Sequence, residues 1–180
     1  MKIITFNIWD APLGISIKRK ERIDRLGDYL KQHDPDILCL QEAFDTKHRD
    51  QVHEALGKDT YHTSDKNDFM RKVLLIARMD MTGGLVTFSK LPIKRCEFTP
   101  FKNPILSSIQ ERIGRKGFLE TELETPNGPL LVISSHLYSL HGTHADGIRI
   151  YQLKQIFKKT KKKRESMTSM LMGDLNEDTL

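Results

Sequence analysis

Residues 37–44 read ILCLQEAF, a stretch in which four consecutive apolar residues lead into Gln41 and Glu42. A short uninterrupted apolar run of this kind is typical of a strand that is covered on both faces. Such a strand lies in the interior of a layered domain. The stretch therefore predicts a sheet with further layers on both sides, and it places a carboxylate where the strand ends.

The sequence on either side of this stretch alternates between strand-like and helix-like segments. Residues 2–8 (KIITFNI) are β-branched and apolar and predict a strand. Apolar residues then recur at helical spacing over 23–30, with Asp34-Pro35 as a stop signal, and again over 52–56. The first third of the chain is therefore predicted as strand, helix, strand and helix.

The second half of the chain continues this alternation. Its predicted segments are the strands 85–89 (LVTFS) and 118–123 (FLETEL), a hairpin turn at 126–128 (PNG) into 129–137 (PLLVISSHL), a helix around 148–157 and a last strand at 167–172 (MTSMLM). Alternating elements without a repeat favour an α/β (α+β) layered fold. We expect a single domain over residues 1–180.

Composition excludes several classes of protein. The 180 residues are 38% hydrophobic and 29% charged, which suffices for one core. The two cysteines, Cys39 and Cys96, stand far apart and predict neither a disulfide scaffold nor a CxxC metal site. The N-terminus shows no signal peptide, and no apolar run could span a bilayer. We therefore expect a cytoplasmic or peripheral membrane protein.

The net charge of +5 comes from one basic run. Residues 158–164 carry six positive charges, so the rest of the chain sums to −1. The favoured interpretation is a solvated helix end or loop, and the alternative is a patch that makes transient contact with phosphate or an anionic membrane. Nucleic acid is a less expected partner, because a near-neutral remainder does not predict a basic groove.

Polar side chains follow four of the predicted strands. They are Asn7, Glu42, His136 and the pair Asp174 and Asn176. If these strand ends meet, the side chains converge at one rim, where α/β sheets commonly hold ligands. In an extended segment residues i and i+2 share a face, so the aspartate and asparagine can address one ligand while Leu175 points into the core.

The residue types at these positions suit phosphoryl chemistry. Magnesium binds oxygen ligands and often takes only one or two carboxylates, so Glu42 and the Asn7 amide could anchor it. A histidine such as His136 can stabilise phosphate charge, and Asp174 can orient or deprotonate a water. Taken singly, each signal also has an ordinary structural interpretation as a turn, surface or satisfied polar residue.

The order of the motifs resembles the endonuclease/exonuclease/phosphatase superfamily. The matching segments are TFNIWD (5–10), LCLQEAF (38–44), GGLVTFSKLPI (83–93), KGFLETEL (116–123), VISSHLYS (132–139), Arg149 with Gln152, and MGDLNED (172–178). This resemblance implies a sandwich of two β-sheets flanked by helices. It also implies a hydrolase that uses Mg²⁺, or Mn²⁺ or another divalent cation.

The resemblance implies roles for individual residues. Glu42 would be the magnesium ligand with Asn7 beside it, and His136 would bind the scissile phosphate. Asp174 would orient or activate the attacking water, and Asn176 would hold the phosphate and the neighbouring ligands. These implied roles agree with those argued from the residue types.

The segments 83–93, 116–123 and 134–139 are similar to sphingomyelinases and related phospholipase C-like members of the superfamily. We therefore expect a phosphodiester substrate, foremost a phospholipid. A nuclease or an inositol phosphatase of the same superfamily is the alternative, and a non-catalytic fragment that retains metal or phosphate binding is another. The oligomeric state is left open.

Two further histidines, His141 and His144, follow His136 in a loop containing Gly and Thr. They could be read as a second metal site, but no carboxylate partner is evident, and a mobile loop on the substrate side is the favoured interpretation.

Members of the superfamily end with a Ser-Asp-His-type motif whose histidine is the general base. None of the seven histidines of this chain lies beyond Asp174. We therefore expect the domain to be incomplete at its C-terminus and residues 1–180 alone to be nearly inactive, since general-base catalysis contributes about 10²- to 10⁴-fold.

Overall fold

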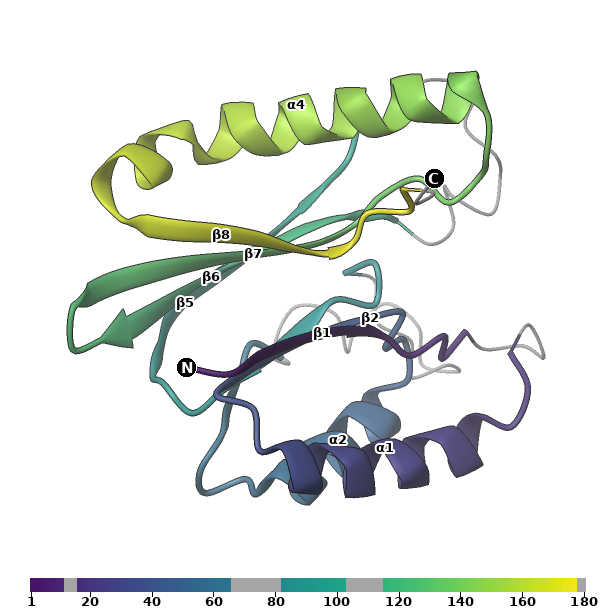
Figure 1. Cartoon of the computed structure of the whole chain (residues 1–180), viewed down its shortest axis with the longest axis vertical. Coiled ribbons are helices and arrows are strands. Elements are labelled where there is room, and N and C mark those ends of the chain that lie inside the picture. The colour runs from purple at the N-terminus through teal and green to yellow at the C-terminus, as the bar shows by residue number, and fades with distance from the viewer. Residues whose placement is uncertain (12–15, 66–81, 103–114, 178–180) are drawn as a thin grey trace.

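The computed structural model describes residues 1–11, 16–65, 82–102 and 115–177. Within these residues, two four-stranded sheets and three helices form the fold (Figure 1). The first sheet contains β1 (Ile3–Asn7), β2 (Ile37–Gln41), β4 (Val86–Ser89) and β3 (His62–Thr63), in that spatial order. The second contains β5 (Ile93–Pro100), β6 (Gly117–Thr125), β7 (Gly128–His136) and β8 (Thr168–Asp174), also in spatial order. The helices are α1 (Arg19–His33), α2 (Thr46–Leu56) and α4 (Thr143–Ser166).

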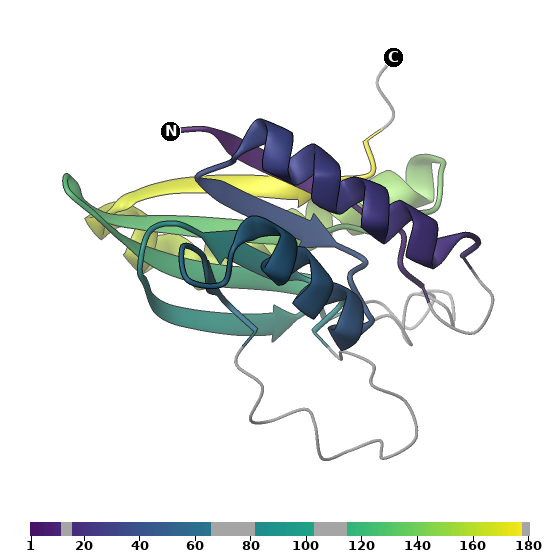
Figure 2. The same cartoon turned by 90° about the horizontal axis from the view of Figure 1, so that it is seen from below.

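The layers confirm the predicted sandwich of two sheets flanked by helices. Helices α1 and α2 lie side by side over the outer face of the first sheet (Figure 2), and α4 runs along the outer face of the second sheet (Figure 1). Three apolar clusters fill the spaces between the four layers.

Strand β2 shows why the layers take this order. Leu38 and Leu40 pack in the cluster beneath α1 and α2, whereas Ile37 and Cys39 pack in the cluster between the sheets. All four side chains are 0% exposed. Because burying one such side chain stabilises a fold by roughly 1.5–3 kcal/mol, this strand can lie only between two apolar layers. The prediction of a strand covered on both faces is confirmed.

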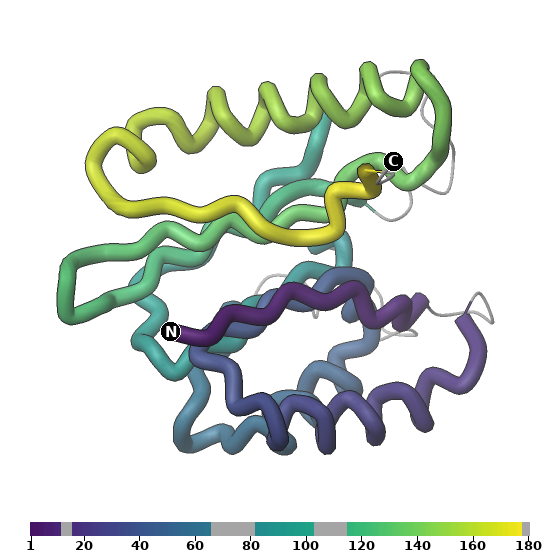
Figure 3. The backbone as a smooth tube through the Cα atoms, in the orientation of Figure 1, coloured from purple at the N-terminus to yellow at the C-terminus, as the bar shows by residue number. Residues whose placement is uncertain are grey.

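Two β-α-β units bring four strand ends to one side of the sandwich. β1 pairs with β2 in parallel across α1, and β7 pairs with β8 in parallel across α4 (Figure 3). In each pair the last residues lie opposite each other, Asn7 beside Gln41 and His136 beside Asp174. β1 also contacts β8 across the sandwich. The carboxyl ends of strands from both sheets therefore meet.

The helix boundaries follow local signals. α1 ends at His33, after which Asp34 takes a left-handed conformation with φ 43° and Pro35 prevents continuation. α2 begins after Asp45, whose side chain accepts a hydrogen bond from the backbone nitrogen of Lys47 at 2.9 Å. The basic run 158–164 lies in the last turns of α4.

Strands β3 and β5 were not predicted from the sequence. β3 is only two residues long. β5 carries Lys94, Arg95 and Glu97, which break the alternation of apolar and polar residues that marks a strand. It lies at an edge of the second sheet, where charged side chains are favoured because they discourage pairing with another chain.

The pairing of the last residues of β8 with β7 depends on Gly173. This glycine has φ 137°, and a Cβ placed on it would lie 1.9 Å from the carbonyl oxygen of Ser135 in β7. No side chain can be accommodated there without moving β8 away from β7.

We expect Gly173→Ala to lower the free energy of unfolding by about 2 kcal/mol or more, because it combines backbone strain with a clash against backbone. Gly147→Ala is the matched control. Gly147 lies within α4, and a Cβ there meets nothing within 4 Å, so alanine should stabilise the helix by about 0.5–1 kcal/mol. Urea denaturation of the two variants measures both effects. If the two variants were equally stable, the close contact between Gly173 of β8 and Ser135 of β7 would be contradicted.

Candidate active site

Three side chains from both sheets converge on the amide of Asn7 at the end of β1. The Asn7 Nδ2 atom donates to Glu42 Oε1 and to Asp174 Oδ2, each at 2.8 Å. The Nε2 atom of His136 lies 3.9 Å from Glu42 Oε1 and 3.7 Å from Asp174 Oδ2. The structure thus brings together four of the five residues singled out from the sequence.

His136 is buried, with a side chain that is 4% exposed. Burial lowers the pKa of His136 to about 3, the charge of Lys116 adds to this effect, and the charge of Asp174 opposes it. Its short distances to the two carboxylates are therefore contacts of a neutral imidazole and not ion pairs. A neutral imidazole carries one N–H group that can donate to an oxygen at the site.

Lys116 belongs to the KGFLETEL motif but was given no chemical role from the sequence. Its Nζ atom donates to the carbonyl oxygen of Leu137 at 2.7 Å, and the residue is buried. This contact places a positive charge close to His136. A lysine directly before an apolar strand was the available signal, but it is indistinguishable in sequence from an ordinary surface lysine.

The backbone at this rim takes conformations that side-chain-bearing residues seldom adopt. Trp9, Glu42 and Asn176 have φ values of 47°, 54° and 51°. The Oδ1 atom of Asn7 accepts from the backbone nitrogen of Trp9 at 2.9 Å, which holds that turn. Gly84 packs closely against the backbone of Glu42, because a Cβ on Gly84 would lie 2.8 Å from the Glu42 Cα. Conformations of this kind cluster at functional sites.

Asn176 fixes the chain around Asp174. Its Nδ2 atom donates to the carbonyl oxygen of Leu137 at 2.9 Å, and its backbone nitrogen donates to Asp174 Oδ1 at 3.1 Å. Leu175 packs against the apolar cluster beneath α4, as predicted. Asp178, the last residue of the MGDLNED motif, lies outside the described residues.

The motif residues Arg149 and Gln152 hold the segment that follows β7. Gln152 Oε1 accepts from the backbone nitrogen of Tyr138 at 2.9 Å, and Arg149 Nη1 donates to the carbonyl oxygens of Tyr138 and Leu140 at 3.1 and 2.8 Å. Both residues are buried in α4. Their contribution is to position the loop next to His136.

A buried carboxylate behind Glu42 was missed from the sequence. Asp10 has a side chain that is 1% exposed, and its Oδ1 atom accepts from Arg19 Nε at 2.6 Å and from His48 Nδ1 at 2.9 Å. Its backbone nitrogen donates to the carbonyl oxygen of Glu42 at 3.0 Å. Asp10 also raises the pKa of Arg19, chiefly through their hydrogen bond. The network anchors the residue that follows β2.

The donor set at the rim fits a hard divalent cation. Glu42 and Asp174 present carboxylate oxygens to the same amide nitrogen, and their side chains are 18% and 28% exposed, so solvent reaches both. Magnesium is usually held by one or two carboxylates, with water and substrate phosphate completing its coordination. Two carboxylates beside an amide match that pattern.

Across residues 1–11, 16–65, 82–102 and 115–177, no group of three or more His, Cys, Asp or Glu side chains could hold a metal by itself, and this includes the rim. A cation at the rim would therefore need water and substrate oxygens in addition to the two carboxylates. His141 and His144 are exposed, and His144 lies in the first turn of α4.

Within the described part of the chain, no helix is long and apolar enough to cross a bilayer.

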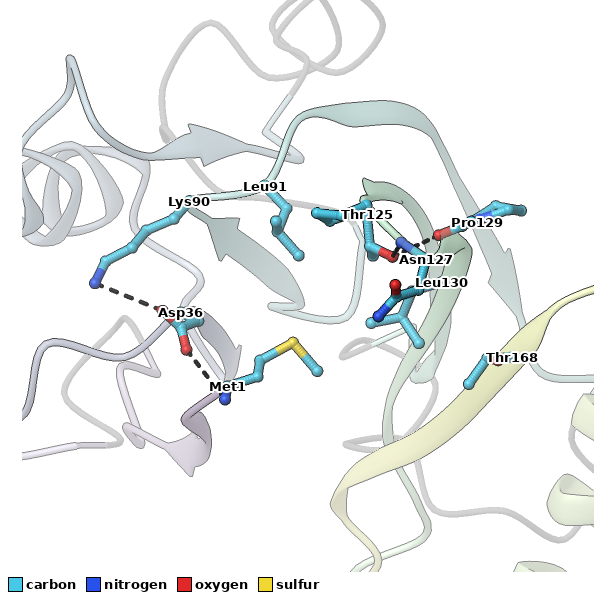
Figure 4. A pocket seen from close by; sticks show the side chains of 11 residues that line it. Met1, Asp36, Lys90, Leu91, Thr125, Asn127, Pro129, Leu130 and Thr168 are labelled. Carbon is cyan, nitrogen blue, oxygen red and sulfur yellow. Dashed lines mark hydrogen bonds and ion pairs between the residues drawn. The ribbon is translucent and has the colours of Figure 1, made fainter.

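A hollow of about 560 Å³ lies at the opposite end of the sandwich, between the start of β1 and the β6–β7 turn (Figure 4). The Asp36 carboxylate lies between the N-terminal amine of Met1 and Lys90, at 3.8 and 3.7 Å. Lys90 also pairs with Asp34 at 2.8 Å, so two carboxylates balance the two cations at this hollow. The chemistry described above is therefore concentrated at the other end.

We expect Asp10→Asn to lower the free energy of unfolding by about 2–3 kcal/mol, because it leaves Arg19 and His48 without their buried partner. Asp24→Asn is the control, since Asp24 makes an exposed i,i+4 pair with Lys20 and should change stability little. Chemical denaturation compares the two variants. Equal stabilities would contradict the anchoring role of Asp10.

Comparison with known proteins places the chain in a family. The sequence model of the Endonuclease/Exonuclease/phosphatase family matches residues 4–179. Inositol phosphosphingolipids phospholipase C of Schizosaccharomyces pombe is 25% identical over 162 residues, which are 86% of this chain and 35% of that protein. This chain therefore spans about a third of the length of that relative.

Solved structures share the fold. Sphingomyelinase C from Streptomyces griseocarneus has a TM-score of 0.78 at 24% identity, covering 98% of this chain and 64% of that one. A beta toxin mutant from Staphylococcus aureus with bound magnesium ions has a TM-score of 0.79 at 23% identity, covering 99% and 65%. D. rerio TDP2 complexed with single strand DNA product has a TM-score of 0.69 at 17% identity, covering 99% and 62%. With its family model matched over almost its whole length, the chain belongs to the Endonuclease/Exonuclease/phosphatase family.

Proposed function

We propose that this protein is a magnesium-dependent phosphodiester hydrolase of the sphingomyelinase or phospholipase C type. The observation that carries the proposal is the convergence of Glu42, Asp174 and His136 around the Asn7 amide, at the meeting point of four strand ends. A carboxylate pair with a neutral histidine supplies a cation site, a hydrogen-bond donor and a proton acceptor within one small volume.

Glu42 and Asn7 would hold the divalent cation, Mg²⁺ or alternatively Mn²⁺ or another ion. When bound there, such an ion would neutralise charge on a phosphoryl oxygen and polarise the phosphorus centre. Glu42 is well suited to this role, because the backbone contacts of Asp10 and the close approach of Gly84 fix its position. The carboxylate is therefore preorganised.

His136 would donate its N–H group to an oxygen of the scissile phosphate. Because its pKa lies near 3, the imidazole stays neutral at physiological pH and keeps this donor across the working range. Asp174 would orient or deprotonate the attacking water, with its Oδ1 atom held by the backbone of Asn176. Asn176 would also keep the phosphate-facing loop in place through Leu137.

A phospholipid is the favoured substrate class. The segments 83–93, 116–123 and 134–139 are similar to sphingomyelinases, and the S. pombe relative is named for phosphosphingolipids. Apart from residues 158–164 the chain is near neutral, which is unlike a nuclease groove. The DNA complex of the TDP2 relative is the observation that keeps a nuclease as the second candidate.

Magnesium should raise the thermal midpoint of unfolding. A cation that binds only the native state stabilises it by about 1.4 kcal/mol at roughly ten times its dissociation constant. Glu42→Gln removes the charge that attracts the ion and should abolish the shift. Glu54→Gln is the control, because Glu54 is an exposed helix residue paired with Lys58, and it should retain the shift. No change in the melting of wild-type protein at millimolar magnesium would refute the metal assignment.

The substrate class is tested by ranking substrates in one magnesium buffer at moderate salt. The assay uses a longer chain that carries a C-terminal Asp-His motif, because residues 1–180 alone are expected to be nearly inactive. Lipids with a phosphocholine headgroup should be hydrolysed faster than plasmid or abasic DNA. Asp174→Asn should reduce the rate on lipid by about 10²-fold or more, because it removes the carboxylate that orients or activates the attacking water. The readout is the release of phosphorylated headgroup against the release of nicked DNA. If DNA were hydrolysed fastest, the protein would belong to the nuclease branch. If Asp174→Asn left the rate on lipid unchanged, Asp174 would have no role in the reaction.

A further inference from the structure

Helix α4 exposes apolar and basic side chains on one face, which we call the basic aromatic face. It consists of Ile150, Tyr151, Lys154, Phe157, Lys158, Lys161 and Lys162. These positions follow helical spacing, in the adjacent rows 150, 154, 157, 161 and 151, 158, 162. The three apolar members are 53%, 45% and 45% exposed in chain order.

The opposite side of α4 explains why these residues point outward. Ile148, Gln152, Ile156 and Thr160 are buried, and Ile156 belongs to the cluster under the second sheet. The helix thus uses one side for packing and presents the other away from the sandwich (Figure 1). Solvent-facing helix surfaces are mostly polar, and Ile150, Tyr151 and Phe157 make this side of α4 partly apolar.

The basic run splits into two groups with different surroundings. Lys159 and Lys163 turn toward the second sheet and bind Glu97 at 3.0 Å and Glu120 at 2.6 Å. These two residues are structural. They account for part of the positive charge that the sequence shows in this region.

Within the described part of the chain, three of the four lysines on the basic aromatic face have no such partner, and the fourth, Lys161, forms an exposed ion pair with Glu165. Lys154, Lys158 and Lys162 have no acidic partner among the residues that the structure describes, and Lys161 is only 3.9 Å from Glu165. Arg164 lies over the ring of Phe157 at 5.1 Å, which adds a further positive charge beside the apolar members. The face therefore combines uncompensated positive charge with apolar surface.

We propose that the basic aromatic face of α4 is a docking surface for anionic lipid bilayers. Lysines there would meet lipid phosphates and carboxylates, while Ile150, Tyr151 and Phe157 would enter the boundary between headgroups and acyl chains. The outer side of a helix can lie flat on a bilayer, whereas single-stranded nucleic acid is usually tracked by a groove. An aliphatic side chain such as Ile150 gains nothing from a phosphate backbone.

The inference goes beyond the proposed hydrolysis and does not rest on it. It concerns a surface formed by α4 alone, and it is tested by binding and not by turnover. If the protein failed to bind vesicles, the proposal for the active site would still stand. If it failed to hydrolyse substrate, the proposal for the docking surface would still stand.

The experiment measures partitioning of the protein onto vesicles by co-sedimentation, without divalent cations. The vesicles are pure phosphatidylcholine, or phosphatidylcholine with about 30 mol% phosphatidylserine. Wild-type protein should bind the anionic vesicles and release them as salt rises, because screening shortens the reach of the lysines. Binding to the neutral vesicles should be much weaker.

The variants separate charge from apolar contact. Changing Lys154, Lys158 and Lys162 together to Gln should weaken binding by up to about 5-fold per residue and about 100-fold in all. Changing Lys20, Lys31 and Lys47 of α1 and α2 to Gln removes the same charge from the opposite side of the molecule and should have little effect. Ile150→Ser should weaken binding several-fold and leave thermal unfolding unchanged, since the side chain is exposed.

Three results would overturn the proposal. The first is wild-type protein that fails to sediment with anionic vesicles at low salt. The second is an equal loss of binding in the two triple variants, which would reduce the effect to net charge. The third is tighter binding to duplex or single-stranded DNA than to the vesicles at the same salt, with Ile150→Ser indistinguishable from wild type, which would assign the face to nucleic acid.

Discussion

Burial of β2 on both faces is the constraint on which the rest of the structure depends. Ile37 and Cys39 require a second sheet on one side, and Leu38 and Leu40 require helices on the other. A strand with four fully buried apolar residues cannot lie at a surface without losing several kcal/mol of transfer free energy. The four-layer order follows, with α1 and α2 outside one sheet and α4 outside the other.

The candidate site forms only because the two sheets pack against each other in one fixed arrangement. Gln41 Nε2 donates to Ser134 Oγ at 3.3 Å, and Thr121 Oγ1 donates to Thr87 Oγ1 at 3.3 Å, so buried polar groups join the sheets directly behind the rim. These pairs must form, since an unpaired buried polar group is costly. At the rim itself, the Asn7 amide joins carboxylates from the two sheets.

Charge is distributed unevenly over the molecule. The rim presents carboxylates next to a neutral histidine, whereas most of the unpaired positive charge of α4 lies on its outer face. Among the described residues, the α4 lysines that form ion pairs do so with Glu97, Glu120 and Glu165, and not with Glu42 or Asp174. Cation binding at the rim and contact with an anionic surface on α4 are therefore compatible in one chain.

The sequence by itself determined the strand–helix alternation, the doubly covered strand and the residues Asn7, Glu42, His136 and Asp174, because periodicity and strand-end positions are local properties. It could not reveal β5, whose charges suit an edge that exists only in the sheet, or Asp10, whose importance comes from partners 9 and 38 residues away. Only the tertiary structure decided which lysines face the sheet and which face outward, because helix rotation is set by packing against β6, β7 and β8. For the same reason, the neutrality of His136 was decided by its burial and by Lys116, and these become neighbours only when the second sheet forms.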